Sequence, residues 1–302
     1  MRVSVIINNY NYSKYIISAL RSVENQTLKA HEVIIVDDGS SDNSLEILRD
    51  FCTKKENFTI ITQENQGQLS AILNGILASE GDLICLLDAD DEYEMNHLEL
   101  VLNTFRDHPH VGMRFCDVQE IGKKTSTSRF VPYYGDLGKT AMLTYLTADF
   151  TGNVTSSLAF KSDTLRKLVP FLKTFEPDWF TRADNCLIWA SSLAGFCFFN
   201  AQDASVKYRV HGNNLFAGAT EDPRQRWDYI VKREWFIQKI STDVRFSPAS
   251  LKWLYREYET SCVKKPARFK KYRRAIFSFR NPHPWNKKIS LLFKLIFSHI
   301  RK

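Results

Sequence analysis

The chain places four carboxylates within five residues, directly after an apolar run: Asp88, Asp90, Asp91 and Glu92. Carboxylates this close repel one another, so the cluster indicates a bound cation, a shared proton or a capping role. Asp90 or Asp91 could cap a helix that begins near Met95, with the other acids close to its positive end. Capping leaves Asp88 unexplained, because this residue ends the apolar strand itself.

Two other interpretations of the cluster fit poorly. An EF-hand loop that starts at Asp88 would place Tyr93 at the sixth position, where the sharp turn needs glycine. The first strand-to-helix turn, NNYN at residues 8–11, lacks the glycines that let a backbone approach a pyrophosphate. A diphosphate bound here would need another counter-charge, and Mg²⁺ or Mn²⁺ held by an Asp-x-Asp pair supplies one. The sequence therefore favours a binding site for a metal-bound diphosphate at residues 88–90.

The segments that must position this binding site alternate between a strand-like and a helix-like spacing of apolar residues. Apolar, β-branched runs predict strands at Val3–Ile7, Glu32–Val36, Phe58–Thr62, Leu83–Leu87 and Val111–Val118. Helical spacing fills the gaps at Tyr15–Val23, Ser44–Phe51, Gln68–Ala78 and His97–Phe105. This alternation predicts an α/β fold with a mostly parallel sheet and helices on both faces. Polar segments follow the first four strands, and ligands of such sheets bind beyond the carboxyl ends of strands. We expect one binding edge there.

The pattern is weaker beyond about residue 120. We expect a loop at Lys123–Arg129, a turn-rich connector at VPYYGDLG (residues 131–138) and a helix that opens near Asp184 and closes at Gly195. The segment ASVKYRVH alternates like a strand, and helical spacing rich in aromatic residues begins at Arg224.

Composition limits the class of protein. With 302 residues, 44% hydrophobic and 25% charged, the chain is typical of a globular protein with ample core, and no window of about 18 apolar residues is present. Six scattered cysteines without a C-x-x-C pair argue against a zinc site or a disulfide framework and fit a reducing cytosol. We see no signal peptide and expect a cytoplasmic protein.

The net charge of +7 is unevenly distributed. Residues 263–302 contain thirteen Lys or Arg and no acid, which leaves 28 basic and 34 acidic residues, a net charge of −6, in the first 262. We therefore expect no nucleic-acid partner for the whole surface. Within the basic tail, Ile289–Ile300 is apolar around Lys294, with Trp285 before it. Two interpretations stay open: an interfacial helix on an anionic membrane surface, or a terminal helix packed on the body.

An ordered set of motifs resembles a known family. VSVIINNYNYSKYI, VIIVDDGSSDNS, QENQGQ, GDLICLLDADD and YRVHGNN together resemble the family-2 inverting glycosyltransferases of the GT-A fold, over roughly residues 3–215. The resemblance implies a Rossmann-like GT-A domain at 1–215, with a nucleotide-sugar-binding half at 1–118 and an acceptor-binding half at 119–215. A helical extension with a basic amphipathic tail would follow at 216–302.

The resemblance also implies roles for single residues. Asn8, Asn9, Tyr10 and Asp38 would line the nucleobase pocket, with Asn65 and Gly67 near it. Asp88-Ala89-Asp90 stands where these enzymes carry their DXD motif: Asp90 would approach the ribose or the metal, and Asp91 or Asp88 would coordinate the ion. His211 would be either a surface residue or a further contact of the metal or the diphosphate. Arg209 would either neutralise phosphate charge or be a residue of the strand without a role in binding. One departure is Asn8, where members often have proline.

An inverting transfer needs a carboxylate base that is not a metal ligand, because the ion would suppress its basicity. In the resembling family this base lies at the start of a helix in the second half, and TRADNCLIW makes Asp184 the candidate, against the alternative of a simple N-cap. Asp178, in EPDWF, is the fallback.

We therefore expect a metal-assisted glycosyltransferase, using Mn²⁺ or Mg²⁺, a UDP-sugar donor and a glycan or lipid-linked acceptor of cell-envelope polysaccharide. It would attach peripherally to the inner face of the cell membrane. The alternatives are a nucleotidyltransferase of related fold, which should carry a Gly/Arg/Lys-rich phosphate loop after the first strand, and a non-catalytic nucleotide-sugar-binding module.

Overall fold

A computed structural model describes residues 1–123, 125–211, 222–246 and 252–300. Four parallel strands form the first half of the sheet, in the order β3-β2-β1-β4. They are β1 (Val3–Asn9), β2 (Glu32–Asp37), β3 (Phe58–Thr62) and β4 (Leu83–Asp88). The intervening helices are α1 (Ile16–Glu24), α2 (Ser44–Cys52) and α3 (Gln68–Ala78), and α4 (His97–Asp107) follows β4. The predicted βαβ organisation is confirmed here, with ends within two residues.

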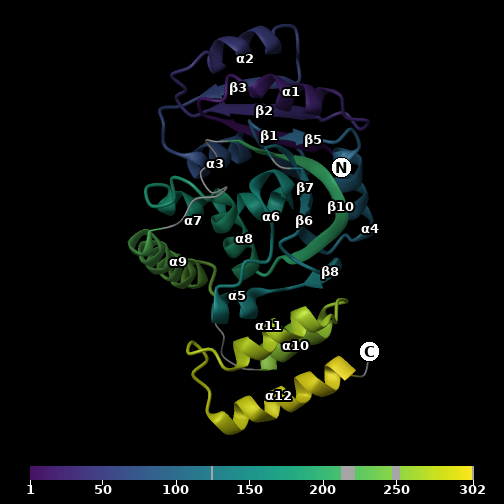
Figure 1. Ribbon diagram of the computed structural model, residues 1–302, viewed down its shortest axis with the longest axis vertical. Helices are drawn as coiled ribbons and strands as arrows, with labels where there is room; N and C mark the ends of the chain where they lie inside the picture. Colours follow the sequence, from purple (N-terminus) through teal and green to yellow (C-terminus); the bar gives the residue numbers. More distant parts are fainter. Residues whose placement is uncertain (124, 212–221, 247–251, 301–302) are drawn as a thin grey trace.

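Helices cover both faces of this half of the sheet. Side chains alternate along β1, so Ile6 packs with the apolar face of α3 while Val5 and Ile7 pack with α1 and α4. Burial on both faces explains why the strands are apolar throughout and do not alternate with polar residues. Figure 1 shows α3 and α1 on opposite sides of β1.

The second half of the sheet is mixed. β9 (Ala159–Lys161) lies between β4 and β6 (Val111–Gly122) and is antiparallel to both, while β10 (Cys197–Val210) runs parallel to β6. The short strand β5 (Glu92–Tyr93) closes the sheet against β10. The acids after β4 thus belong to a strand and a turn, and not to the first turn of a helix.

Two further strands lie where a loop and a connector were expected. β7 (Ser126–Ser128) pairs with β6, and β8 (Gly135–Gly138) pairs with β10. Both segments lack an apolar repeat, and the long edges of β6 and β10 supply their hydrogen-bond partners. β8 pairs with a strand far from it in the sequence, whereas β7 forms a hairpin with the end of β6 and consists of the polar residues Ser126–Ser128, so local apolar periodicity missed both.

The helices of the second half surround α8 (Ala183–Leu193), in which every residue except Asp184 is buried. They are α5 (Ala141–Thr147), α6 (Ser162–Arg166) and α7 (Val169–Leu172), with 3₁₀ turns at Thr155–Ser157 and Lys173–Phe175. Helix α8 begins within one residue of the predicted start.

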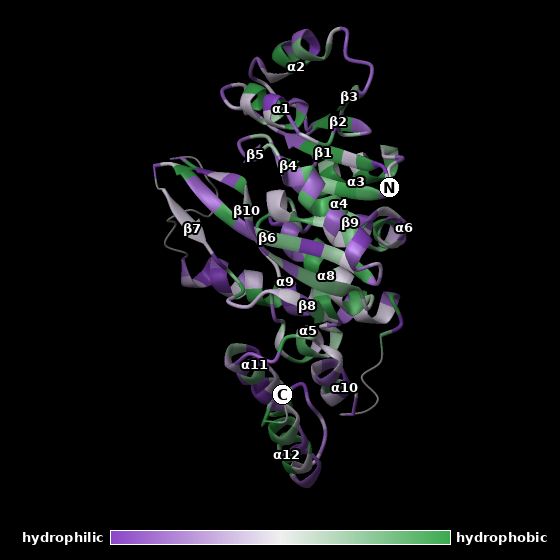
Figure 2. Ribbon diagram, turned by 90° about the vertical axis from the view of Figure 1, so that its right-hand side faces the viewer, coloured by the Kyte–Doolittle hydropathy of each residue, from purple (hydrophilic) through white to green (hydrophobic). Residues whose placement is uncertain are grey.

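The C-terminal helices divide between two clusters. α9 (Pro223–Asp243) places Phe236, Ile237 and Ile240 in the same core as α3 and α8. α10 (Lys252–Thr260), α11 (Pro266–Ile276) and α12 (Trp285–Ile300) form a separate cluster with α5, at the end of the molecule remote from α2 (Figures 1 and 2). The expected boundary at residues 215–216 lies outside the described residues. Within the described ranges, no helix is long and apolar enough to cross a bilayer.

Candidate active site

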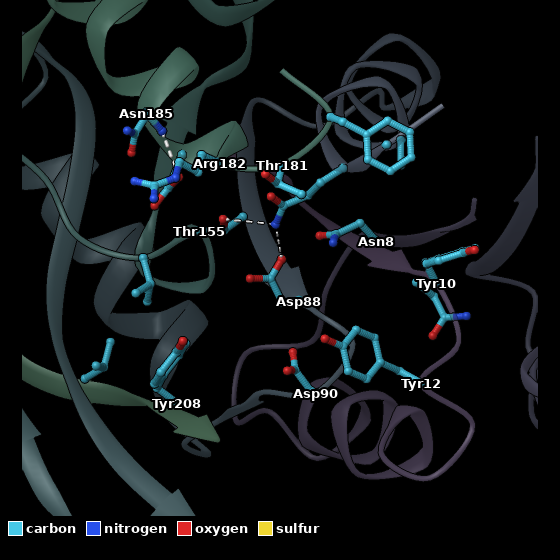
Figure 3. A pocket seen from close by; sticks show the side chains of 18 of the residues that line it. Asn8, Tyr10, Tyr12, Asp88, Asp90, Thr155, Thr181, Arg182, Asn185 and Tyr208 are labelled. Atoms are coloured by element: carbon cyan, nitrogen blue, oxygen red, sulfur yellow. Dashed lines mark hydrogen bonds between the residues drawn. The ribbon is translucent and has the colours of Figure 1, made fainter. Parts of the chain in front are cut away.

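The ends of β1, β2 and β4 and the start of α8 border one cavity of about 830 Å³. A cavity of this size is in the range that holds a small-molecule ligand. Figure 3 shows side chains from both halves of the sheet around it. Eight of the predicted site residues line it: Asn8, Asn9, Tyr10, Asp38, Gly67, Asp88, Asp90 and Asp184. The predicted edge of the sheet therefore borders a space suited to a ligand.

Asp88 ends β4, opposite Asn8 in the register with β1. Its carboxylate accepts a hydrogen bond of 2.9 Å from the Gln68 side chain, and its amide donates to the Ser156 hydroxyl at 3.0 Å. Burial, and then the charge of Asp90, raise the pKa of Asp88 from 3.8 to about 7, although hydrogen bonds from Asn8 and Gln68 act in the opposite direction. A cation beside this pair would favour the charged form of both carboxylates.

Asp90 lies beside His211, which follows β10. The Asp90 carboxylate and Nε2 of His211 are 2.9 Å apart, and both side chains are about nine-tenths buried. The His211 ring stacks on Tyr15, with 5.1 Å between centroids, and meets the edge of Tyr12. The fold thus joins residues 121 positions apart in the sequence: Asp90 lines the cavity, and His211, which pairs with it, is not among the lining residues.

Asp91, although adjacent in sequence, is not brought to the cavity. It is completely buried, and its two carboxylate oxygens accept hydrogen bonds from the Ser156 hydroxyl at 2.6 Å and the Arg209 amide at 2.8 Å. Burial raises the pKa of Asp91 well above its ordinary value. Arg209 donates from Nε to the Asp90 carbonyl at 2.9 Å and forms an ion pair with Glu92. These contacts fasten the acidic turn to β10.

Asp38 connects the second and third polar segments. Its carboxylate accepts hydrogen bonds from the amides of Gln66 and Gly67, each at 2.8 Å, and from the Gln63 side chain at 2.7 Å. Gly67 has φ +92°, which favours glycine. Asn65 is exposed and does not line the cavity. The carboxylate that the sequence assigns to base recognition therefore also holds the loop before α3.

Asn8 and Asn9 end β1 and have the same kind of unused acceptor. The Asn9 side-chain amide donates to Asp37 at 2.7 Å and to Ser40 at 3.1 Å, but Oδ1 of Asn8 and Oδ1 of Asn9 are both buried without a hydrogen-bond partner among the described residues. Tyr10 is 42% exposed at the rim. A buried, unpartnered amide oxygen that lines a cavity costs free energy unless a ligand donates to it. Asn8 and Asn9, which both line the cavity, are therefore polar candidates for a contact with the bound ligand.

Asp184 projects from the first turn of α8. It is partly exposed to the cavity, and one carboxylate oxygen accepts the amide of Asn185 at 2.8 Å. Burial raises the pKa of Asp184 from 3.8 to about 6, partly opposed by backbone hydrogen bonds and by the nearby Arg182 guanidinium. A carboxylate with a raised pKa is a stronger base than an ordinary aspartate and is still ionised at neutral pH. Asp178 is exposed and lies outside the cavity lining.

Gln68, for which the sequence gave no role, links the two halves of the site. Its side chain donates to Asp88 at 2.9 Å and accepts from the Ala183 amide at 3.3 Å, while its own amide donates to the Phe180 carbonyl at 2.8 Å. A polar residue at the first position of a helix, directly after a polar loop, was the only signal in the sequence. Two of its partners, Phe180 and Ala183, come from a segment more than a hundred residues away.

Aromatic side chains form the other wall of the cavity and were also missed. Phe130, Phe150, Phe180, Tyr208 and Tyr229 line it, together with the aliphatic Val118, Val154 and Val210. Phe180 is 47% exposed, whereas the neighbouring Trp179 is buried in the core. These residues come from loops, from β6, from β10 and from α9, so no common spacing marks them in the sequence.

The residues present fit a divalent cation held together with a ligand. Within residues 1–123, 125–211, 222–246 and 252–300, no group of three or more His, Cys, Asp or Glu is arranged to hold an ion. Asp90 and His211 offer two ligands side by side. Mg²⁺ and similar ions commonly take one or two protein ligands and complete their shell with water and substrate phosphate.

Comparison with known proteins identifies the family. The sequence model of glycosyl transferase family 2 matches residues 4–169. An uncharacterized glycosyltransferase of Nostoc sp. is 32% identical over 237 residues, which cover 74% of this chain and 70% of the relative. The chain therefore belongs to glycosyl transferase family 2, and it is a glycosyltransferase.

Solved structures agree on the fold. The fragment 1-349 of S. aureus TarS in complex with UDP-GlcNAc superimposes with a TM-score of 0.60 at 15% identity, over 100% of this chain and 92% of that fragment. The mannosyltransferase PcManGT from Pyrobaculum calidifontis, in complex with GDP-Man and Mn²⁺, gives a TM-score of 0.52 at 15% identity, over 99% and 87% of the two chains. The predicted GT-A fold is thus confirmed.

Proposed function

We propose that this glycosyltransferase moves a sugar from a UDP-sugar to a hydroxyl acceptor with inversion, and that Asp184 is the base. The proposal rests on the exposure of Asp184, which is the one residue of α8 that is not buried. Asp184 faces the same cavity as Asp88 and Asp90, while the rest of α8 is buried. TarS binds UDP and UDP-GlcNAc, and PcManGT binds GDP-Man, which supports a nucleotide-sugar donor.

In the proposed reaction, the ionised Asp184 carboxylate accepts the proton of the acceptor hydroxyl. The acceptor oxygen forms its bond to the anomeric carbon as the bond between that carbon and the diphosphate oxygen breaks, and the nucleoside diphosphate leaves with the electron pair. Attack from the face opposite the leaving group inverts the anomeric centre. Asp184 can act in this way because it is a different carboxylate from the one that pairs with His211: it accepts from the Asn185 amide, while Asp90 meets His211.

Mn²⁺ or Mg²⁺ held by Asp90 and His211 would offset the negative charge of the departing diphosphate. Asp88 would meet the ribose or share the ion, and Asn8, Tyr10 and Asp38 would contact the nucleobase. The sequence alone offered Asp91 as a ligand, but its two oxygens are taken by Ser156 and Arg209. We therefore assign Asp91 to fixing the turn.

Calorimetric titration of UDP, with and without Mn²⁺, tests the metal assignment. We expect Asp90→Asn to abolish the gain in affinity that Mn²⁺ gives to the wild type. Asp91→Asn, its neighbour in sequence, should retain that gain in the fraction that folds. If Asp91→Asn loses the Mn²⁺ effect while Asp90→Asn keeps it, our ligand assignment is wrong.

The base assignment and the stereochemistry need separate measurements. Asp184→Asn should bind UDP as the wild type does and lose about 10²–10⁴-fold in turnover. Donor hydrolysis followed by NMR should release first the anomer opposite to that of the donor. Full activity of Asp184→Asn, or release of the retained anomer, would contradict the inverting mechanism.

For the acceptor we propose a glycan or a lipid-linked sugar of cell-envelope polysaccharide synthesis. The aromatic wall formed by Phe130, Phe150 and Tyr229 offers flat apolar surfaces that suit the faces of sugar rings. We further propose that the enzyme acts at a membrane surface on which such an acceptor is carried.

A further inference from the structure

Helix α12 is held against α10 and α11 in one rotational setting. Leu291 and Leu295 are buried in the C-terminal cluster. The Tyr258 hydroxyl lies 2.8 Å from Nδ1 of His299, and the His299 ring stacks on Phe269 with 4.7 Å between centroids. Since these contacts lie on one side of the helix, the side chains of another face are turned away from the protein.

That outward face is apolar. Trp285, Ile289, Phe293 and Phe297 follow one another at four-residue spacing and thus form one stripe along the helix, which Ile300 extends. Their exposed fractions lie between 46% and 73%. Beside the stripe, the Phe277 ring lies 5.6 Å from that of Trp285, and Phe279 is 89% exposed. We call Trp285, Ile289, Phe293, Phe297 and Ile300 the α12 stripe.

Exposed cations lie in the same C-terminal segment as the stripe, and two of them, Lys287 and Lys294, are on α12 itself. They are Lys265, Lys270, Arg273, Arg274, Lys287 and Lys294. Residues 263–302 contain no acid to neutralise them. Three other basic residues of this segment are already engaged: Lys271 with Asp149, Arg280 with Glu234, and Arg268 with the Leu137 carbonyl.

We propose that the α12 stripe docks the protein on an anionic lipid bilayer, with the stripe at the boundary between headgroups and acyl chains. An exposed apolar face beside Lys and Arg is typical of helices that lie in this interface, and Trp285 suits the headgroup level. A second copy of the chain fits less well, because stripe-to-stripe contact would bring two basic segments together. This inference rests on the membrane location proposed above and names the surface that makes the contact.

Vesicle flotation with the full chain tests the docking surface. We expect the wild type to float with vesicles of phosphatidylcholine mixed with phosphatidylglycerol, to float poorly with phosphatidylcholine alone, and to detach at high salt. Replacing two exposed rings, Phe293→Gln together with Phe297→Gln, should lower the bound fraction about tenfold or more. Glutamine keeps helix propensity, so the helix itself should persist.

A matched control is Trp227→Gln, which removes a ring that is 65% exposed on α9 and should leave flotation unchanged. The proposal is overturned if the wild type does not float with anionic vesicles, or if the double variant floats equally well. A wild-type dimer that the double variant lacks, without vesicle binding, would assign the stripe to a second copy. UDP binding is measured in parallel without lipid and tests the proposed transfer chemistry alone. A failure of the docking surface can therefore be told apart from a failure of the proposed function.

Discussion

At the scale of single residues, the proposed role of Asp184 as the base predicts how the activity depends on pH. Its pKa is raised to about 6, so it is protonated below that pH and cannot accept a proton. We expect kcat/KM to fall about tenfold per pH unit below about 6. Measuring kcat/KM from pH 4.5 to 8 checks this, with UDP affinity followed over the same range to separate donor binding from proton transfer.

The same pKa shift predicts that the ionised Asp184 lowers the stability of the folded protein. A carboxyl group whose pKa rises from 3.8 to about 6 on folding holds its proton more tightly in the folded state, so folding stability falls as the pH rises through this window. Above about pH 6, Asp184→Asn should therefore stabilise the free protein by about 1–3 kcal/mol. Thermal unfolding at pH 8 and at pH 4 measures this; an equal effect at both pH values would contradict it.

Gln68 is a positioning residue, because it touches the Asp88 carboxylate and the amide that starts α8. Gln68→Met keeps the length of the side chain but removes both hydrogen bonds. We expect kcat to fall about 10- to 100-fold with a smaller change in UDP affinity, since the two halves of the site lose their link. Gln66→Met, two residues earlier with an exposed side chain, is the control and should stay near wild-type activity.

At the scale of elements, the start of α3 and the segment before α8 are packed too closely for any side chain at residue 67. A Cβ on Gly67 would lie 2.6 Å from the Phe180 carbonyl oxygen, in a backbone with φ +92°. We expect Gly67→Ala to displace the segment that carries Asp184, and thus to lower both stability and turnover.

Gly135→Ala separates the effect of backbone strain from the effect of the close contact with Phe180. Gly135 has a similar φ of +105°, but a Cβ there would have no contact closer than 3.6 Å. It should cost only the backbone strain of about 1–3 kcal/mol and leave turnover nearly unchanged. Chemical denaturation and steady-state kinetics on both variants measure the difference. Equal losses in both would show that the contact with Phe180 is unimportant.

At the scale of the whole molecule, the basic tail is part of the fold. Met142, Leu143 and Leu146 of α5 pack with Leu291 and Leu295 of α12. A chain truncated after residue 262 would expose this cluster, so we expect it to lose on the order of 5 kcal/mol or more and to aggregate. The stripe variant at Phe293 and Phe297 changes only exposed side chains and should unfold at the wild-type temperature. Thermal unfolding and light scattering of both proteins check this.

The sequence alone largely determined the first half of the fold. Buried parallel strands must be apolar throughout, and amphipathic helices must repeat every three or four residues, so periodicity revealed β1–β4 and α1–α4. The absence of glycine-rich phosphate loops indicated a cation at Asp88-Ala89-Asp90. The order of the motifs indicated the family, which the comparisons confirm.

Only the tertiary structure decided which neighbours in the sequence share a site. Asp90 and Asp91 are adjacent, yet one meets His211 at the cavity and the other is buried between Ser156 and Arg209. It also resolved the basic tail, in which one face of α12 is packed and another is exposed. These contacts join segments from about 40 to about 150 residues apart. Local spacing fixes the direction of a side chain within its own element, whereas the partner it meets depends on how distant elements pack.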